Sequence, residues 1–297
     1  MRVLISGASG FLGTELTRAL RQSGEQVSAL VRCEAQGDDV RWGPQQPLDP
    51  AKLASYDAVV HLAGKSIAGR WSEKFKRELL ASRVQGTRTL ATAVAESFRR
   101  TGQPRAFLSA SGIGYYGDRG DEILTEDSAA GTGFLAELSR EWEAATAPAS
   151  EAGVRVVCLR IGVVLGRNGG ALKQLLLPFR LGLGGRIASG NQYWSWVSLE
   201  DVIGIMLVAL RDDSLCGPVN VVAPSPARNA EFVRDLGNVL HRPTIFPFPE
   251  FAVRALLGEM GQELLLTSAR VIPKKLQEHG FSFVHGDLEH ALRAALR

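Results

Sequence analysis

Short apolar runs alternate with longer helical patterns through the first 165 residues of the chain. Runs rich in β-branched residues predict five strands, at 2–6, 26–32, 58–62, 106–110 and 154–159. Between them, apolar residues at helical spacing predict helices over 11–23 and 72–100. Strands that alternate with helices are typical of a parallel sheet, and right-handed crossovers place helices on both of its faces. We therefore expect a doubly wound α/β fold.

The pattern changes after Gly166. A glycine-rich run at 182–185 and a cluster of proline and aromatic residues at 243–251 indicate a separate, smaller lobe. Three further elements are predicted: a helix at 201–210, a strand at 219–222 and a helix at 288–296. We expect a main body of residues 1–166, with contributions from about 196–223, and a C-terminal substrate lobe built mainly from 167–297.

Composition and charge exclude several classes of protein. The 34 basic and 31 acidic residues leave a net charge of only +3, with no stripe of Lys and Arg, so nucleic acid and anionic membranes are poor candidate partners. No stretch of 18 residues is apolar throughout, and only three apolar residues follow Met1 and Arg2, which is too few for a signal peptide. Cys33, Cys158 and Cys216 are far apart and odd in number. We therefore expect a cytoplasmic protein whose cysteines are small buried hydrophobes.

Residues 6–13 read SGASGFLG, between the first predicted strand and the first predicted helix. In a GxxGxxG loop the first glycine permits a tight turn, the second lets a pyrophosphate approach the backbone, and the third packs helix against strand. The helix N-terminus adds unpaired N–H donors and partial positive charge. The segment therefore predicts the dinucleotide-binding loop of a Rossmann-type domain, with a merely structural turn as the alternative.

The residue at the end of the second strand normally selects the dinucleotide. A carboxylate at this position accepts a hydrogen bond from the adenosine ribose and would repel a 2′-phosphate. Arg32 stands there instead, although Glu34 follows in the loop. We predict that NADP(H) is preferred over NAD(H). The alternative is that Arg32 is only a solvated arginine at a strand end.

Four segments occur in the order in which one known superfamily has them. They are 6–13, 61–64 (HLAG), 109–117 (SASGIGYYG) and 159–166 (LRIGVVLG). On these segments the chain resembles the extended short-chain dehydrogenase/reductase superfamily, the NAD(P)-dependent epimerases and dehydratases. The resemblance implies a Rossmann-type sheet, an NADP(H) cofactor and a small-molecule substrate.

A narrower resemblance covers nearly the full length. Its segments are 63–71 (AGKSIAGRW), 82–84 (SRV), 194–197 (WSWV), 273–276 (PKKL) and 280–281 (GF). They resemble the "epimerase family protein" subgroup of atypical extended members, some of which are described as cell-division inhibitors. The subgroup implies cofactor binding, while its substrate is generally unassigned.

The glycine loop and the resemblance together imply a set of cofactor-binding residues. They are Gly7, Ser9, Gly10, Phe11, Leu12, Gly13, Arg32, Leu62, Ala63, Gly64, Ser109, Ala110, Arg160, Ile161 and Gly162. Arg160 ends a predicted buried strand, where it could also bind a substrate anion or pair with a carboxylate.

The chain departs from the superfamily in its proton relay. Reductases of this group use a tyrosine and a lysine four residues later, which are neighbours on one face of a helix. The residues four positions after Tyr56, Tyr115, Tyr116 and Tyr193 are Val60, Arg119, Gly120 and Val197. No lysine occurs between Lys76 and Lys173. The standard relay is therefore absent.

Three hydroxyls remain as candidate catalytic groups: Ser111, Tyr115 and Tyr116. Ser111 stands at the position of the superfamily's serine. A tyrosine without a cationic neighbour keeps its ordinary pKa near ~10 and is an inefficient base at neutral pH. The alternative is that Tyr116 is only part of a turn that closes over the cofactor and has no catalytic role. We predict slow or undetectable reduction of ordinary sugar and carbonyl substrates.

Four residues are candidate substrate contacts. Lys65 could supply charge to a phosphate, a ribose or an acidic substrate, or be a solvated loop lysine. Trp194, Ser195 and Trp196 could form a wall over the substrate, or pack in the core. His61 is interpreted as a packed strand-end residue. The five histidines show no ligand spacing, so no metal site is expected.

Two hypotheses for function follow. The first is an NADP(H)-dependent oxidoreductase or epimerase that acts on an unidentified small polar substrate between the two parts of the chain. The second is a catalytically weak or inactive NADPH-binding regulator, related to cell division or redox sensing. Extended members often dimerise through the two long helices that here correspond to 72–100 and 134–147, so a homodimer is expected by analogy.

Overall fold

The computed structural model describes residues 1–297, and its centre is a seven-stranded parallel sheet. The strand order is β11-β7-β5-β4-β1-β2-β3. These strands are β1 (Arg2–Ser6), β2 (Gln26–Val31), β3 (Val40–Arg41), β4 (Ala58–His61), β5 (Ala106–Gly112), β7 (Arg155–Ile161) and β11 (Gly217–Val221). The predicted doubly wound α/β fold is confirmed, and six of the strands lie where the apolar runs predicted them.

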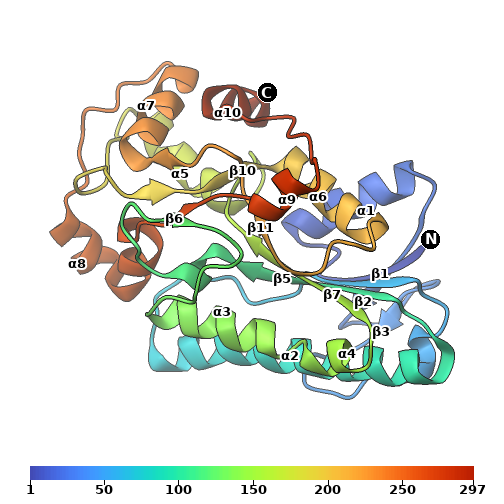
Figure 1. The fold of residues 1–297 in the computed structure, drawn as a ribbon. Coiled ribbons are helices and arrows are strands. Elements are labelled where there is room, and N and C mark those ends of the chain that lie inside the picture. The colour runs from blue at the N-terminus through green and yellow to red at the C-terminus, as the bar shows by residue number, and fades with distance from the viewer.

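Helices cover both faces of the sheet (Figure 1). One layer contains α2 (Glu73–Thr101), α3 (Phe134–Ala144) and α4 (Ala147–Glu151). The other contains α1 (Phe11–Gln22), α6 (Leu199–Arg211) and the short α9 (Lys274–Glu278). The helix predicted over 134–147 is thus divided into α3 and the start of α4.

The strands read as continuous apolar runs because both faces of the sheet are buried. Within β1, Val3 and Ile5 pack in the core beneath α1 and α6, while Leu4 between them packs in the core beneath α2. Successive side chains of a strand point to opposite faces, so one short run contributes to two cores. Leu90 and Val94 of α2 complete the second core at the spacing of one helical turn.

The smaller lobe contains four helices and two short strand pairs. The helices are α5 (Gly170–Arg180), α7 (Asn229–Leu240), α8 (Glu250–Gly261) and α10 (Leu288–Leu296). The strand pairs are β8 (Val163–Leu165) with β10 (Trp196–Ser198), and β9 (Tyr193–Trp194) with β12 (Ala227–Arg228). The lobe has its own buried cluster, which includes Phe179, Trp196 and Phe232. The sequence patterns predicted α10 but not α5, α7 or α8.

The last part of the chain returns to the middle of the molecule. Strand β13 (Arg270–Val271) pairs in parallel with β6 (Ile123–Leu124). Beside this pair, the buried carboxylate of Glu126 accepts hydrogen bonds from the backbone N–H groups of Asn220, at 3.0 Å, and Lys275, at 3.4 Å. Three segments that are far apart in sequence therefore meet at one buried acid.

The three cysteines differ in their burial. Cys158 is buried as predicted, but Cys33 and Cys216 are exposed because they lie in loops beyond the sheet, so that interpretation is wrong for two of the three cysteines. None of the helices combines the length and the apolar character needed to cross a membrane.

Candidate functional site

The glycine loop joins the end of β1 to the start of α1. Gly7 has a φ of +75°, and a Cβ on it would lie 2.8 Å from the backbone nitrogen of Ala63. A Cβ on Gly13 would lie 2.1 Å from the carbonyl oxygen of Gly7. Both distances are far below van der Waals contact, so both positions require glycine. The loop is therefore a tight cradle in which the positions of Gly7 and Gly13 leave no room for a side chain.

The first turn of α1 leaves hydrogen-bond donors free. Gly10 is the N-cap and has no side chain to bond the helix end. The N–H groups of Phe11, Leu12 and Gly13 have no partner within the protein, and the neighbouring Ser9 is exposed. Unpaired donors and the partial positive charge of a helix N-terminus favour an anion at this point. The residues therefore fit the diphosphate of a dinucleotide.

Arg32 lies one residue beyond β2, at the edge that the sequence predicted. Its side chain is exposed and takes part in no hydrogen bond or ion pair within the protein. Glu34 is also exposed and does not pair with it. The guanidinium is therefore available to an anionic ligand next to the glycine loop.

The segment after β4 lies directly against the glycine loop, since β4 and β1 are parallel neighbours. The backbone N–H of Leu62 donates to the carbonyl oxygen of Ser6 at 3.0 Å, and that of Ala63 lies 3.4 Å from the Ser6 hydroxyl. Gly64 follows them. Leu62, Ala63 and Gly64 are therefore placed beside the cradle, as expected of cofactor contacts.

His61 is a packed residue at the end of β4. Its Nδ1 lies 2.5 Å from the Ser6 hydroxyl, and its Nε2 has no partner within the protein. Complete burial lowers the pKa of His61 to about 4, because the charged imidazolium would lose its hydration. His61 is therefore neutral at physiological pH, in agreement with its interpretation from the sequence.

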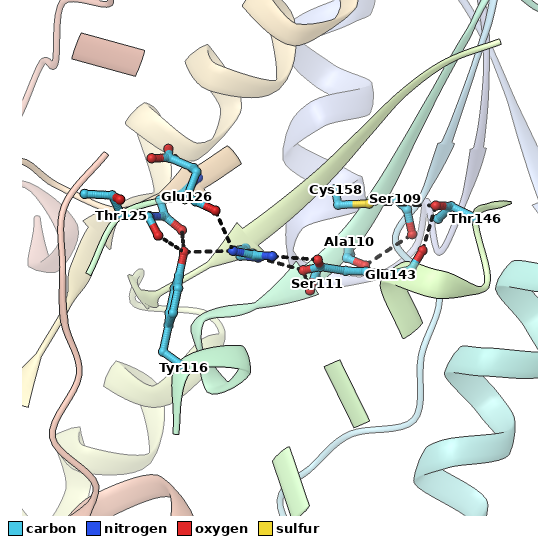
Figure 2. A network of polar contacts seen from close by, with 11 residues as sticks. Ser109, Ala110, Ser111, Tyr116, Thr125, Glu126, Glu143, Thr146 and Cys158 are labelled. Atoms are coloured by element: carbon cyan, nitrogen blue, oxygen red, sulfur yellow. Dashed lines mark hydrogen bonds and ion pairs between the residues drawn. The ribbon is translucent and has the colours of Figure 1, made fainter. Parts of the chain in front are cut away.

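A buried ion pair occupies the carboxyl ends of β5 and β7. Glu143 of α3 accepts hydrogen bonds from Nε and Nη2 of Arg160, each at 2.8 Å, and from the hydroxyl of Ser111 at 2.7 Å. Figure 2 shows Ser111 directed toward Glu143. A two-pronged arginine–carboxylate pair is the strong form of this contact. Of the alternatives for Arg160, the geometry supports pairing with a carboxylate and argues against direct cofactor binding.

Tyr116 is locked into the same network (Figure 2). Its hydroxyl lies 2.7 Å from Asn220 Oδ1 and 2.9 Å from the Thr125 carbonyl oxygen, and accepts from Arg160 Nη1 at 3.0 Å. Burial raises the pKa of Tyr116 to about 12, although Arg160 acts in the opposite direction. This arrangement argues against proton exchange from Tyr116 and favours a structural role. Tyr115 differs, because it is only partly buried and its hydroxyl bonds to nothing in the protein.

The other predicted cofactor residues at this edge lie deeper. Ser109 and Ala110 are buried within β5, where the Ser109 hydroxyl donates to the Ala110 carbonyl oxygen at 3.2 Å. Ile161 ends β7 and is partly buried. A Cβ on Gly162 would lie 2.5 Å from the Ser195 carbonyl oxygen, so this glycine serves backbone packing.

The predicted substrate contacts are not brought together. The Lys65 ammonium pairs with Glu78 at 2.5 Å. Trp194 and Trp196 are buried in the core of the smaller lobe, and Ser195 between them is fully buried. The Ser195 hydroxyl donates to the Ala269 carbonyl oxygen at 2.7 Å. These placements argue against substrate contacts from the two tryptophans and Ser195, and support their alternative role in core packing.

A polar cleft of about 480 Å³ separates the loops that follow β5 from the region of α8. Gly117 and Gly133 line one side, and Arg254 and Glu263 line the other. Burial raises the pKa of Glu263, whose carboxylate accepts from the backbone N–H of Leu135 at 3.3 Å. The sequence patterns missed Arg254 and Glu263, because both belong to a segment without superfamily motifs. Their only sequence signal is ordinary helical charge spacing.

Comparisons with known proteins agree with this geometry. The profile of the NAD dependent epimerase/dehydratase family matches residues 3–222, and a family described as a domain of unknown function (DUF1731) matches residues 248–295. Epimerase family protein Mb2239 of Mycobacterium bovis is 43% identical over 293 residues, 98% of this chain and 96% of that protein. Human epimerase family protein SDR39U1 is 38% identical over 297 residues, 99% of each chain.

Solved structures give the same result. The crystal structure of human epimerase family protein SDR39U1 (isoform 2) with NADPH has a TM-score of 0.89 to this chain at 36% identity, and all of each chain is covered. UDP-N-acetylglucosamine 4-epimerase from Bacillus cereus shares the fold, with a TM-score of 0.76 at 17% identity over 99% of this chain and 98% of that chain. The resemblance that the sequence motifs indicated is confirmed.

Proposed function

Because the chain belongs to the NAD-dependent epimerase/dehydratase family, we propose that it is an NADP(H)-dependent oxidoreductase or epimerase that acts on a small polar substrate. The observation that carries this proposal is the glycine cradle with its three unpaired N–H donors at the start of α1. A diphosphate would satisfy these donors. The cofactor, once bound, supplies or accepts a hydride.

The preference for NADP(H) over NAD(H) rests on Arg32. A guanidinium meets a phosphate with paired, charge-assisted hydrogen bonds, whereas a ribose hydroxyl gains much less from it. Arg32 is exposed and unpaired beside the cradle, so no internal partner has to be displaced. The NADPH in the structure of the human relative is consistent with this preference.

The proton that accompanies hydride transfer must come from this chain or from water. Tyr115 is the remaining candidate, because Ser111 and Tyr116 already bond to internal partners. The Arg160 guanidinium lies 3.5 Å from the centre of the Tyr115 ring, so it contacts the ring face. Since Arg160 bonds to Glu143 and Tyr116, it is a weak substitute for the lysine of the standard relay. We therefore expect slow turnover.

A second candidate function is an NADPH-binding regulatory protein with little or no turnover. The observation that favours it is the saturated network of Ser111, Glu143, Arg160 and Tyr116, in which no hydroxyl is left for a substrate. In this case the cofactor would be a bound signal. A partner captured only when NADPH is bound would support this function.

We also propose a cytoplasmic location and a homodimer. The proposed location rests on the odd number and wide spacing of the cysteines. The proposed dimer rests on analogy with the extended members of the superfamily. The two long helices of that analogy, α2 and α3, lie side by side in one layer (Figure 1). Light scattering that gave a monomer mass near 32.0 kDa at tens of micromolar would contradict the dimer.

Calorimetric titration tests the cofactor proposal. NADPH should bind about ten- to a hundredfold more tightly than NADH, as expected for a charged hydrogen bond. Arg32→Ala should remove most of this difference and leave NADH affinity nearly unchanged. Equal affinities in the unmodified protein, or a preference that survives the substitution, would assign cofactor selection to another group.

A carbonyl-substrate panel, monitored by NADPH absorbance, tests the reaction. Turnover above about 10 per second, the median for enzymes, would show that a complete relay exists. Comparison of Tyr115→Phe with Tyr116→Phe would then locate it, because only Tyr115→Phe is expected to slow turnover.

A further inference from the structure

One face of helix α5 presents leucine side chains to solvent. Leu172, Leu176 and Phe179 pack in the core of the smaller lobe, so the opposite face of the helix is expected to be polar. That face contains Leu177 and Leu181 instead, whose side chains are 68% and 65% exposed. These two leucines are one helical turn apart and therefore lie side by side. The fold leaves this apolar stripe uncovered.

A loop from a distant part of the chain extends the exposed stripe. Gly185 forms an isolated antiparallel bridge with Ile245, and a Cβ on Gly185 would lie 1.8 Å from the carbonyl oxygen of Phe246. Leu183, Ile245 and Phe246 are each more than half exposed. Together with the two leucines of α5, they make up five of the ten large apolar side chains that the protein exposes. Apolar side chains gathered in this way mark an interaction site.

Four cations are interspersed with these apolar side chains. Arg242 donates from Nε to the Arg180 carbonyl oxygen at 2.9 Å, which holds the loop against the end of α5. Lys173 lies one turn before Leu177 on the exposed face of the helix. All four cations are exposed and none of them takes part in an ion pair: Lys173, Arg180, Arg186 and Arg242.

No acidic side chain offsets these four charges. The chain has no Asp or Glu between residues 152 and 199 or between residues 241 and 249. On the adjoining helix α7, Asp235 pairs with Arg234 at 2.9 Å, and Glu231 accepts from a backbone N–H at the start of that helix. The five apolar side chains and the four cations therefore form a surface with unbalanced positive charge, which we call the basic apolar surface.

The charge and the shape of the basic apolar surface limit what can cover it. A two-fold contact between copies of the chain would bring two groups of four cations together, which is unfavourable. A docked peptide helix needs a long apolar groove. The cavity beside Ile245 holds about 290 Å³, and the other four apolar side chains do not line it. A lipid bilayer needs no preformed groove, because apolar side chains enter between the acyl chains while Lys and Arg meet the headgroup phosphates.

We propose that the basic apolar surface docks the protein on membranes that contain anionic phospholipids. The net charge of +3 conceals this surface, because acids elsewhere on the protein offset cations that are gathered on one lobe. The proposal therefore replaces the expectation, drawn from the net charge, that anionic membranes are poor partners. The binding is peripheral, and it depends neither on the cofactor nor on turnover.

Sedimentation of the full-length protein with vesicles tests the charge. The unmodified protein should bind vesicles of phosphatidylcholine mixed equally with phosphatidylglycerol, should not bind phosphatidylcholine alone, and should be released by salt. Arg180→Gln combined with Arg186→Gln should weaken binding by about ten- to thirtyfold, because each cation near an anionic surface contributes to the attraction. Arg88→Gln combined with Arg99→Gln removes the same charge from exposed positions on α2, and should change binding by less than about twofold.

The apolar contribution is tested in the same way. Leu177→Gln combined with Leu181→Gln keeps good helix formers in α5 and should weaken vesicle binding by about tenfold or more. Val284→Ser is the control, because Val284 is 59% exposed but lies in a loop whose backbone bonds to Asp201 of α6. All of the substituted side chains are exposed, so every variant should keep a thermal midpoint close to that of the unmodified protein.

Three results would overturn the proposal. The first is that the unmodified protein binds neither kind of vesicle, or binds both equally. The second is that both double variants on the basic apolar surface retain full binding. The third is that the unmodified protein ignores the anionic vesicles but binds poly-glutamate, which would assign the surface to an acidic protein partner instead.

Discussion

Two regions along the carboxyl end of the same sheet differ in how their polar groups are used. At the ends of β1, β2 and β4, which we call the cofactor edge, the N–H donors at the start of α1 and the Arg32 guanidinium have no partners within the protein. At the ends of β5 and β7, which we call the closed edge, Ser111, Glu143, Arg160 and Tyr116 bond to one another. The cofactor edge is arranged for a ligand, and the closed edge is satisfied without one.

This difference separates binding from chemistry. Donors that are removed from water without gaining a partner, such as the buried N–H of Gly13 at the start of α1, are costly, so their retention indicates a ligand that completes them. A saturated buried network has the opposite character, because a substrate would have to replace internal hydrogen bonds of similar strength. The loss of the tyrosine–lysine pair is therefore accompanied by a closed scaffold at the position where the reaction is expected.

The largest effect is expected from breaking the buried ion pair of the closed edge. Glu143→Ala leaves Arg160 buried without its countercharge and should lower the free energy of unfolding by about 3–5 kcal/mol. Urea unfolding measures this loss. Glu141→Ala, at an exposed position on the same helix, is the control and should have little effect. A Glu143→Ala loss below about 1 kcal/mol would show that the network is not a scaffold.

A somewhat smaller effect is expected when the pH is lowered, because His61 at the cofactor edge is buried in its neutral form. Burial lowers the pKa of His61 from 6.5 to about 4, so the unfolded chain binds more protons in that interval and stability falls as the pH decreases through it. The contribution lost is about 3 kcal/mol. His61→Gln should flatten the dependence of the unfolding free energy on pH between 6.5 and 4. The exposed His290→Gln should leave it unchanged, and equal slopes for both variants would contradict the assignment.

The smallest effect on stability is expected from removing the hydroxyl groups of the two adjacent tyrosines, and it should differ between them. Tyr116→Phe removes a hydroxyl shared with Asn220 and Arg160 and should destabilise the fold by about 1–3 kcal/mol. Tyr115→Phe should change stability by less than about 0.5 kcal/mol. Thermal unfolding compares the two. NADPH affinity should be unchanged in Tyr116→Phe, and a large loss of affinity would place its hydroxyl at the cofactor.

The sequence predicted the sheet and the glycine cradle because their signals are local. Residues 6–13 contain the strand end, the turn and the helix start in one stretch, and buried parallel strands appear as apolar runs. The elements of the smaller lobe were harder to predict. Helix α5 contains Pro178, and α8 contains Gly258 with a φ of +58°, so their patterns are interrupted.

The closed edge was not predictable in the same way. Glu143 and Arg160 are partners only because β7 and α3 meet in space, and their spacing along the chain gives no signal. Such contacts require the fold to be known first.

The buried Glu126 has a consequence for biosynthesis. Its carboxylate accepts hydrogen bonds from the backbone N–H groups of Asn220 and Lys275, and β6 beside it pairs with β13. The segment around Glu126 therefore gains these contacts only after residues near the C-terminus have been synthesised. A nascent chain leaves the ribosome from its N-terminus, and contacts of such long sequence separation form slowly. Until about residue 275 has emerged from the ribosome, Glu126 and β6 lack their partners. During that time this segment of the growing polypeptide is accessible to proteases and chaperones.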